Sequence, residues 1–336
     1  MIKVAINGFG RIGRLAFRQI VTQTDFDIVA INDLSSAEDL AYLVKYDTVH
    51  RTFHEDEITF EGDEIVVAHQ KRIKVFAEMD PANLPWGELG VDLVLECTGK
   101  FTKLEDARKH IEAGAKKVLI SAPGKGDMKT IVYNVNHNEL TSEDIVISAA
   151  SCTTNCLAPV LKVINDNLGI KKGFMTTIHA YTNDQATLDI AHKKGIKARR
   201  GRACAQNIVP ASTGAASAIG LVIPDLLNKM DGLAFRVPVA DGSVIDVTLE
   251  LKKNTSVEEV NKLLMDNQDE TLKFTMDPIV SSDIIGKKYG ALVDGLSTSI
   301  VEVDDTQLVK IVAWYDNEYG YTCLLYTSDA ADEEDS

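Results

Sequence analysis

The sequence predicts an α/β protein of two domains, and three observations carry this prediction. Its 336 residues are enough for about two domains of ~100–200 residues each. The first 150 residues alternate short apolar runs with helical patterns, as proteins with a parallel sheet do. After about residue 151, longer alternating strands follow one another with fewer helices between them. That second texture is typical of an α+β domain with a mainly antiparallel sheet.

The first domain, residues 1–151, contains five short runs rich in Val and Ile and apolar on both faces, as buried parallel strands are: 3–7, 27–32, 92–97, 117–121 and 145–149. Helical patterns lie between several of them, at 11–21, 37–44 and 104–113. This alternation predicts a doubly wound parallel sheet of the Rossmann type. Residues 58–60 and 65–76 predict a hairpin around Gly62, an antiparallel excursion from that sheet.

The second domain, residues 152–317, begins with a helical pattern over 154–167 that ends at Gly169, a predicted C-cap. Alternating patterns predict strands at 233–239, 243–252 and 307–315. Two further helices are predicted at 211–227 and 257–266.

Composition excludes several classes of protein. The formal net charge of −15 argues against a nucleic-acid binder, which needs a basic face. No run approaches the ~18 apolar residues of a membrane span, and the N-terminus lacks the layout of a signal peptide, so we expect a cytoplasmic protein without a membrane partner. Five cysteines in a chain of this length predict thiols rather than a disulfide framework.

A glycine-rich turn, Gly8-Phe9-Gly10-Arg11-Ile12-Gly13, follows the first predicted strand and opens the first predicted helix. In that context the glycines allow a tight turn, close approach of a pyrophosphate and close packing of helix on strand. Asp33 ends the second predicted strand, 20 residues after Gly13, where its carboxylate can bind a ribose and repel a 2′-phosphate. The pattern predicts an NAD site; the alternative is a plain tight turn with a solvated Asp33.

The segment Ser151-Cys152-Thr153-Thr154-Asn155-Cys156 lies between a predicted strand and a predicted helix. Cys152 would stand at the helix N-terminus, where the partial positive charge favours a thiolate with a lowered pKa. Ser151 and Thr153 can cap the helix or bind an anion. Cys97, Cys156 and Cys204 are interpreted as small core residues. No Cys or His pair at zinc spacing accompanies Cys152, so no metal site is predicted.

Several polar residues lie outside these two motifs. His179 ends a strand-like run and could act as a base towards a thiol, although the sequence alone does not show that the two meet, and a structural role is the alternative. Arg236 stands in an apolar run, where it needs an anion or an acid as partner. The cluster Arg199-Arg200-Gly201-Arg202 predicts an anion site, a solvated loop or a subunit contact.

Taken together, these segments closely resemble the glyceraldehyde-3-phosphate dehydrogenase family over essentially residues 1–323. The resemblance is carried by residues 5–14, 32–34, 45–47, 149–159, 179–184, 210–216, 236–238 and 314–318. It implies NAD-dependent oxidation of D-glyceraldehyde 3-phosphate and transfer of inorganic phosphate to give 1,3-bisphosphoglycerate. In that reaction Cys152 would attack the aldehyde to form a thiohemiacetal and then a thioester, and His179 would act as the base.

The resemblance also implies the binding residues. Thr182 and Arg236 would bind the substrate phosphate. The attacking phosphate would meet Ser151, Thr153, Arg200, Thr213 and Gly214. The cofactor would contact a larger set of residues, with Asn317 holding the nicotinamide amide: Asn7, Gly8, Phe9, Gly10, Arg11, Ile12, Gly13, Asp33, Ser121 and Asn317. The family implies a homotetramer in which the loop around Arg199–Arg202 lies near a neighbouring subunit's cofactor.

Two departures from the family pattern bear on stability and specificity. Residues 318–323 are expected to return to the first domain. Residues 324–336, which hold five acids and no base, resemble a translated sequencing-library adapter and are expected to be a non-native tail, the alternative being a natural acidic tail. Met79 stands where an arginine is frequent in the family, beside the expected adenine site.

Two rival functions remain open. Erythrose-4-phosphate dehydrogenase shares the fold, the cysteine and the histidine, but usually differs at the positions of Thr182 and of Thr213-Gly214. A catalytically impaired nucleotide-binding protein is the rival from another class. A rate of NADH formation from the triose substrate that depends on phosphate would argue against erythrose-4-phosphate dehydrogenase. Fast alkylation of Cys152 would argue against an inactive nucleotide-binding protein.

Overall fold

The computed structural model describes residues 1–193 and 195–325, which form two compact units. Unit 1 comprises residues 1–131 and 137–150 with Leu325, and unit 2 comprises residues 132–136 and 151–324. Residues 318–323, expected to return to the first domain, therefore belong to unit 2. Residues 319–325 are helical, and Leu324 and Leu325 are buried. The rest of the expected tail, 326–336, lies outside the described residues.

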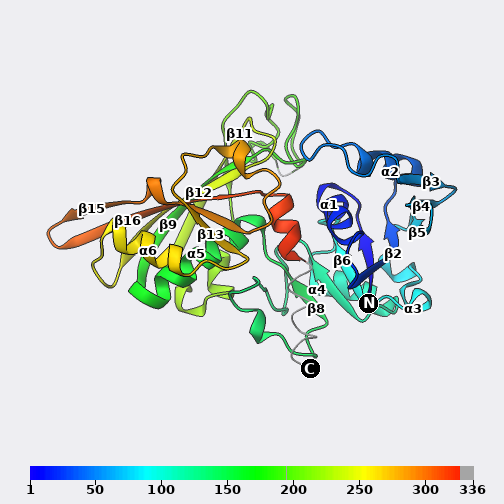
Figure 1. Cartoon of the computed structure of the whole chain (residues 1–336), viewed down its shortest axis with the longest axis horizontal. Helices are drawn as coiled ribbons and strands as arrows, with labels where there is room; N and C mark the ends of the chain where they lie inside the picture. Colours follow the sequence, from blue (N-terminus) through cyan, green and yellow to red (C-terminus); the bar gives the residue numbers. More distant parts are fainter. Residues whose placement is uncertain (194, 326–336) are drawn as a thin grey trace. The chain divides into compact units, whose positions relative to one another are not determined.

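Unit 1 is built on an eight-stranded sheet with the order β3-β4-β5-β2-β1-β6-β7-β8 (Figure 1). Every pair from β5 to β8 is parallel, and only β3, β4 and β5 pair antiparallel. The strands are β1 (Ile2–Asn7), β2 (Phe26–Asn32), β3 (Ile58–Glu61), β4 (Glu64–Val67), β5 (Lys71–Phe76), β6 (Leu93–Glu96), β7 (Lys117–Ile120) and β8 (Val146–Ser148). The helices are α1 (Arg11–Ile20), α2 (Ala37–Lys45), α3 (Trp86–Leu89) and α4 (Leu104–Glu112).

The predicted strands of unit 1 are confirmed, with ends that differ by one residue or so. The run over 65–76 is two strands rather than one, because Ala68 and His69 turn the chain at φ 50° and 58°. The parallel sheet predicted for this domain is confirmed. Its order reverses at β1, since the chain passes from β1 to β2 on one side and later to β6 on the other. In such sheets ligands bind beyond the carboxyl ends of the strands at this reversal.

Unit 2 holds a second eight-stranded sheet, with the order β10-β11-β9-β12-β16-β14-β13 and β15 paired to β16 (Figure 1). Five of its pairings are antiparallel and two, β11 with β9 and β13 with β14, are parallel. The strands are β9 (Ile170–Ala180), β10 (Val209–Ser212), β11 (Met230–Val237), β12 (Ser243–Leu251), β13 (Leu272–Thr275), β14 (Ala291–Asp294), β15 (Ser299–Val303) and β16 (Thr306–Tyr315). The helices are α5 (Cys152–Leu168) and α6 (Val257–Asp266).

The mainly antiparallel second sheet is confirmed, and so is the helix at 257–266. The predicted helix over 211–227 is wrong. Strand β10 ends at Ser212, and two short 3₁₀ turns follow, Ser217–Leu221 and Pro224–Leu226. Pro224 cannot donate a helical hydrogen bond, and Gly220 lies so close to Leu227 that a Cβ there would be 2.7 Å from its Cα.

Helix α5 packs on the second sheet and contacts α6. Its first turn is capped by Ser151, whose hydroxyl accepts a hydrogen bond from the Thr154 amide at 3.1 Å. Its end is set by Gly169 at φ 70°, where a β-carbon would be strained. The helix start therefore holds Cys152 at a fixed point relative to the strands beneath it.

The glycine turn makes a test of packing in unit 1. A β-carbon on Gly13 would lie 2.2 Å from the carbonyl oxygen of Gly8, so helix α1 would have to move from strand β1. We expect Gly13→Ala to lower the free energy of unfolding by ~1–3 kcal/mol, measured by urea denaturation. Gly10→Ala is the matched control, because a β-carbon there meets no atom within 4 Å, and it should change stability little. Equal losses in the two variants would contradict this account of the turn.

Candidate active site

The start of α5 brings the candidate nucleophile to the candidate base. The sulfur of Cys152 lies 3.5 Å from Nε2 of His179, the next-to-last residue of β9. The two residues are 27 positions apart in the sequence, and the packing of α5 against β9 brings them together. The expectation that His179 faces the thiol is therefore confirmed within unit 2.

The proton on the His179 ring is fixed by the backbone. Nδ1 lies 2.7 Å from the carbonyl oxygen of Ala180, and a nitrogen can approach a carbonyl oxygen that closely only with a proton between them. Nδ1 therefore donates, and Nε2 presents its lone pair to the sulfur of Cys152. Nη1 of Arg236 also lies 3.1 Å from Nδ1, but its two protons go to the Ala180 carbonyl oxygen and the Thr182 hydroxyl, each at 3.0 Å. This tautomer lets the ring accept the thiol proton.

The electrostatics of the pair differ from the prediction made for the helix terminus. Burial raises the pKa of the Cys152 thiol, although the charge of Arg236 and hydrogen bonds from Thr153 act in the opposite direction. Burial, followed by the charge of Arg236, lowers the pKa of His179 to about 3. The expected lowered thiol pKa is therefore wrong for the ligand-free site. Both directions favour a neutral thiol facing a neutral imidazole in the ligand-free site, with His179 placed to take the thiol proton as the sulfur attacks.

Next to this pair lies a set of charged and hydroxyl groups. Arg236 donates from Nη1 to the hydroxyl oxygen of Thr182 at 3.0 Å, and Thr182 donates to Asp184 at 2.5 Å. Asp184 also pairs with Arg200. Among the described residues, Nε of Arg236 is buried without a hydrogen-bond partner. A buried guanidinium with an unused donor is a fit for an oxyanion.

The groups expected to bind the attacking phosphate are distributed unevenly. The hydroxyl of Ser151 caps α5, and the hydroxyl of Thr153 lies 2.9 Å from that of Tyr315. Thr213 and Gly214 follow the end of β10, where Arg200 donates to the carbonyl oxygen of the preceding residue at 3.4 Å. Arg200 therefore links this turn to Asp184, the acid beside Thr182.

Asn317 is connected to the same end of β9. Its side-chain oxygen accepts a hydrogen bond from the Ser243 hydroxyl at 2.6 Å. That hydroxyl in turn accepts from the backbone amide of Ala180 at 3.0 Å. With its oxygen occupied, Asn317 presents its amide nitrogen as a donor, which suits a carboxamide oxygen.

Two buried aspartates hold the segment that carries Asn317. Asp316 accepts hydrogen bonds from three backbone amides, those of Gly286, Glu318 and Tyr319, at 2.7, 2.8 and 2.6 Å. These three hydrogen bonds fix the side chain of Asp316 and the backbone that it binds. Asp241 shares a hydrogen bond with Asp316, and burial together with the charges of Asp316 and Glu318 raises its pKa to about 9. Asp241 is therefore the protonated member of the pair at neutral pH.

In unit 1 the carboxyl ends of β1, β2 and β6 surround a pocket of about 320 Å³. This is the place that the strand order predicts for a ligand. The residues that line it come from four segments: Asn7, Gly8, Gly10, Asn32, Asp33, Leu34, Glu78, Met79, Cys97, Thr98, Lys100 and Phe101.

Asp33 and Gly10 show how a dinucleotide fits this pocket. Asp33 accepts from the Phe9 amide at 2.8 Å and from the Ser35 amide at 3.0 Å, so it is held at the wall with lone pairs left for ribose hydroxyls. Gly10 stands at the N-cap of α1 and brings no side chain to it. Because a β-carbon on Gly10 would meet no atom within 4 Å, the glycine keeps open space in front of the helix terminus, where a pyrophosphate is favoured.

Other expected cofactor residues lie behind this wall. The side chain of Phe9 is buried against Phe17 with ring centroids 5.5 Å apart, so only its backbone faces the turn. Arg11 forms a bidentate pair with Asp47, and that pairing holds the pKa of Asp47 at about 2 although burial alone would raise it. Ser121 donates to the carbonyl oxygen of Glu96 at 3.0 Å. Ile12 and Gly13 shape the start of α1.

Sequence reasoning missed several residues of the site. Ser243 and Asp241 carry no motif of their own, and Tyr315 lies in the 314–318 segment but had no expected role. Their roles follow from strand register, because Ser243 pairs with Tyr315 across β12 and β16. The Tyr315 hydroxyl lies 2.8 Å from that of Thr177, and its ring meets the His179 ring edge to face. A polar residue at an inward strand position beside a motif was the one signal that could have found them.

Comparisons with known proteins agree with this geometry. A family model described as "Glyceraldehyde 3-phosphate dehydrogenase, NAD binding domain" matches residues 2–104, and one described as the C-terminal domain of the same enzyme matches residues 151–317. The chain is 58% identical over 325 residues to a glyceraldehyde-3-phosphate dehydrogenase of Clostridium pasteurianum, covering 97% of this chain and 96% of the relative. One of Streptococcus pyogenes is 54% identical over 326 residues, with the same coverage.

The Asp241–Asp316 pair predicts a pH-dependent stability. Because the pKa of Asp241 is raised to about 9, the unfolded chain releases a proton above about pH 4 that the folded chain keeps until about pH 9. Stability contributed by this group is therefore present at acid pH and lost as the pH rises towards 9. Asparagine keeps a donor and cannot ionise. The test measures the free energy of unfolding of the parent protein and of Asp241→Asn by urea denaturation at pH 5 and at pH 8. The difference between variant and parent should shift in favour of the variant by at least ~1 kcal/mol from pH 5 to pH 8.

The exposed Asp231 of the same unit supplies the control for loss of one carboxyl group. Asp231→Asn should not reproduce the gain. If the difference between Asp241→Asn and the parent protein is the same at pH 5 and pH 8, Asp241 is not the protonated member of the pair.

Proposed function

This chain belongs to the glyceraldehyde-3-phosphate dehydrogenase family, and from that premise we propose how its residues divide the reaction between them. The activity is that of the family: NAD-dependent oxidation of D-glyceraldehyde 3-phosphate with inorganic phosphate to give 1,3-bisphosphoglycerate. Cys152 and His179 form the catalytic pair.

The observation that carries the mechanism is the 3.5 Å contact between the Cys152 sulfur and Nε2 of His179, with Nδ1 held by the Ala180 carbonyl. The sulfur attacks the aldehyde carbon, a carbon–sulfur bond forms, and the thiol proton passes to Nε2. The imidazolium then donates a hydrogen bond to the new oxyanion. Loss of the carbon-bound hydrogen as hydride turns the thiohemiacetal into a thioester. Phosphate then attacks the carbonyl carbon, the carbon–sulfur bond breaks, 1,3-bisphosphoglycerate leaves, and the thiolate of Cys152 is regenerated.

We propose that NAD⁺ binds the unit 1 pocket and, when bound, supplies the two-electron acceptor for the oxidation. Asp33 would hold the adenosine ribose, and the turn from Gly8 to Gly13 would hold the pyrophosphate. Asn317 would donate its amide to the nicotinamide carboxamide, because Ser243 already occupies its oxygen. Support for this comes from the match of the chain to the NAD-binding domain model and from the open space at Gly10.

For the two phosphate groups we propose separate sites. Arg236 and Thr182 would bind the phosphate of the substrate, and the unpartnered Nε of Arg236 supports this role. The attacking phosphate would bind among Ser151, Thr153, Arg200, Thr213 and Gly214, where Arg200 supplies the positive charge. Thr182 and Thr213-Gly214 also favour the triose substrate over erythrose 4-phosphate, since enzymes for the latter usually differ at both places.

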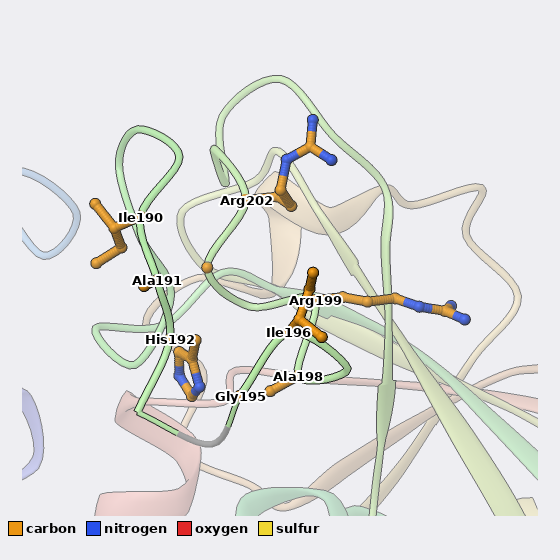
Figure 2. A pocket seen from close by; sticks show the side chains of 9 residues that line it. Ile190, Ala191, His192, Gly195, Ile196, Ala198, Arg199 and Arg202 are labelled. Atoms are coloured by element: carbon orange, nitrogen blue, oxygen red, sulfur yellow. The ribbon is translucent and has the colours of Figure 1, made fainter.

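We propose further that the chain forms a homotetramer and works in the cytoplasm. The segments 186–193 and 195–208 line a pocket of about 330 Å³ and expose several apolar side chains, with Ile196 98% exposed (Figure 2). Apolar exposure of that extent suits a face covered by another copy of the chain. All five cysteines are free thiols, which suits a reducing compartment. Among the described helices, none has the length and apolar character needed to cross a membrane.

Activity with matched variants tests the mechanism. We expect NADH formation from D-glyceraldehyde 3-phosphate to require inorganic phosphate and to exceed the rate with erythrose 4-phosphate. Cys152→Ala should abolish it, and His179→Asn should lower kcat by ~10²–10⁴-fold because the base is lost. Cys204→Ser is the control and should keep the parent rate, since this thiol lies outside the catalytic pair.

Alkylation distinguishes an enzyme from an inactive nucleotide-binding protein. At neutral pH iodoacetamide should react with Cys152 first, because Nε2 of His179 lies 3.5 Å from its sulfur and can take the thiol proton as the new bond forms. Burial raises the pKa of Cys97 to about 12 and that of Cys156 well above its usual value, so these two thiols should react slowly. His179→Asn should slow this reaction. Equal rates for Cys152 in the two proteins, or a phosphate-independent rate of NADH formation, would contradict the proposal.

A further inference from the structure

A chain of buried polar side chains lies behind the unit 1 pocket. It begins at Trp86, the first residue of α3, and passes through His110 on α4 to Glu96 at the end of β6. It continues to Asn7 and Asn32, the last residues of β1 and β2. None of the five is more than 5% exposed. Trp86, Glu96 and His110 do not line the pocket, whereas Asn7 and Asn32 do.

The donor at one end of the chain fixes the proton of the imidazole. Trp86 donates its indole N–H to Nδ1 of His110 at 3.0 Å, and an indole nitrogen can only donate. Nδ1 must therefore accept, which leaves the ring proton on Nε2. Nε2 lies 3.1 Å from Oε2 of Glu96 and donates to it. The His110 ring therefore cannot be flipped without setting its N–H group against that of Trp86.

Glu96 accepts on both of its oxygens. Besides His110, Oε2 accepts from the side-chain amide of Asn7 at 2.5 Å. Oε1 accepts from the backbone amide of Thr98 at 2.8 Å and from the Thr98 hydroxyl. Four donors on its two oxygens fix the orientation of this buried side chain. Because the amide nitrogen of Asn7 must face Glu96, its oxygen must face the other way.

That orientation is passed on to the pocket wall. Oδ1 of Asn7 accepts from Nδ2 of Asn32 at 2.7 Å. Asn32 then pairs with the backbone of Glu78 in both directions, donating to its carbonyl oxygen and accepting from its amide, each at 2.9 Å. Glu78 and Met79 form the pocket wall near Asp33. The indole N–H of Trp86 therefore determines which atom donates and which accepts in every hydrogen bond from His110 to the lining of the pocket.

We propose that Trp86, His110 and Glu96 form a positioning relay for NAD binding. They touch no ligand. They hold the side chains of Asn7 and Asn32, and through them the Glu78 segment, in the arrangement that receives the adenosine half of the dinucleotide. The inference rests on the proposed role of this pocket as the cofactor site. It assigns the relay to ground-state cofactor affinity and not to the chemistry at Cys152.

Two variants of nearly unchanged volume break the relay. Glu96→Gln places an amide group among donors, and His110→Phe removes the imidazole proton while keeping a flat ring. We expect each to raise the Kd of NAD at least ~10-fold in calorimetry, because the side-chain amides of Asn7 and Asn32 are then free to exchange the positions of their oxygen and nitrogen atoms. The Kd of ADP-ribose should rise by the same factor, since it carries the adenosine half. The kcat at saturating NAD and the KM for the triose phosphate should stay within about 2-fold.

A control variant in the same hydrophobic core distinguishes an effect on NAD affinity from a general loss of stability. Val118 is fully buried in the cluster that contains Trp86, and its side chain makes no polar contact. Val118→Ala should lower Tm and leave the Kd of NAD and ADP-ribose within about 2-fold. If Glu96→Gln and His110→Phe lower Tm and leave Kd unchanged in the same way, the relay is overturned.

Two further outcomes keep the test decisive. Trp86→Phe removes only the indole N–H, so it serves if Glu96→Gln or His110→Phe fails to fold. It should raise the Kd of NAD and that of ADP-ribose by about 3-fold. Unchanged Kd values would refute the relay. If the parent protein binds neither NAD nor ADP-ribose, the proposed cofactor site fails instead, which is a result distinct from parent binding with unaffected variants.

Discussion

The backbone carbonyl and amide groups of Ala180 hold the catalytic residues in place. Its carbonyl oxygen accepts a hydrogen bond from Nδ1–H of His179, so Nε2 faces the sulfur of Cys152 as an acceptor. Its amide binds Ser243, and Ser243 sets the orientation of Asn317. The two backbone groups of this one residue of β9 thus fix both the base and the residue proposed to hold the nicotinamide, and this requires that β9 and β12 pair in the observed register. A one-residue slip would turn His179 to the opposite face of the sheet.

The same burial that orders these groups also shapes their charges. Desolvation favours the neutral forms of Cys152 and His179, so the pair faces its substrate without a standing charge separation. Charge appears only when the thiol adds to a carbonyl carbon, and the imidazolium then lies beside the new oxyanion. Arg236, half-buried next to His179, opposes an extra positive charge on the ring until an anion binds to it. A phosphate on Arg236 would offset that opposition, which links substrate recognition to the proton transfer.

Much of the fold could be predicted from the sequence, because strand and helix periodicity is local information. The glycine turn, Asp33 and the parallel sheet follow from it, and so does the helix at 257–266. The stretch over 211–227 shows the limit: its apolar spacing fits a helix, but Gly220 must pack against Leu227, a tertiary contact that outweighs propensity. Ser243, Asp241 and Tyr315 were missed for the same reason, since their roles depend on register and burial. The thiol pKa was predicted from the helix terminus alone, without the desolvation that dominates it.

The account rests most directly on the position of one proton, that on Nδ1 of His179. Nitrogen-15 NMR of the protein with labelled histidine, compared with His179→Asn to assign the ring, measures this position at neutral pH. The account predicts that Nδ1 carries the proton and that Nε2 is unprotonated in the ligand-free protein. A neutral ring protonated at Nε2, with Nδ1 accepting from Arg236, would contradict it.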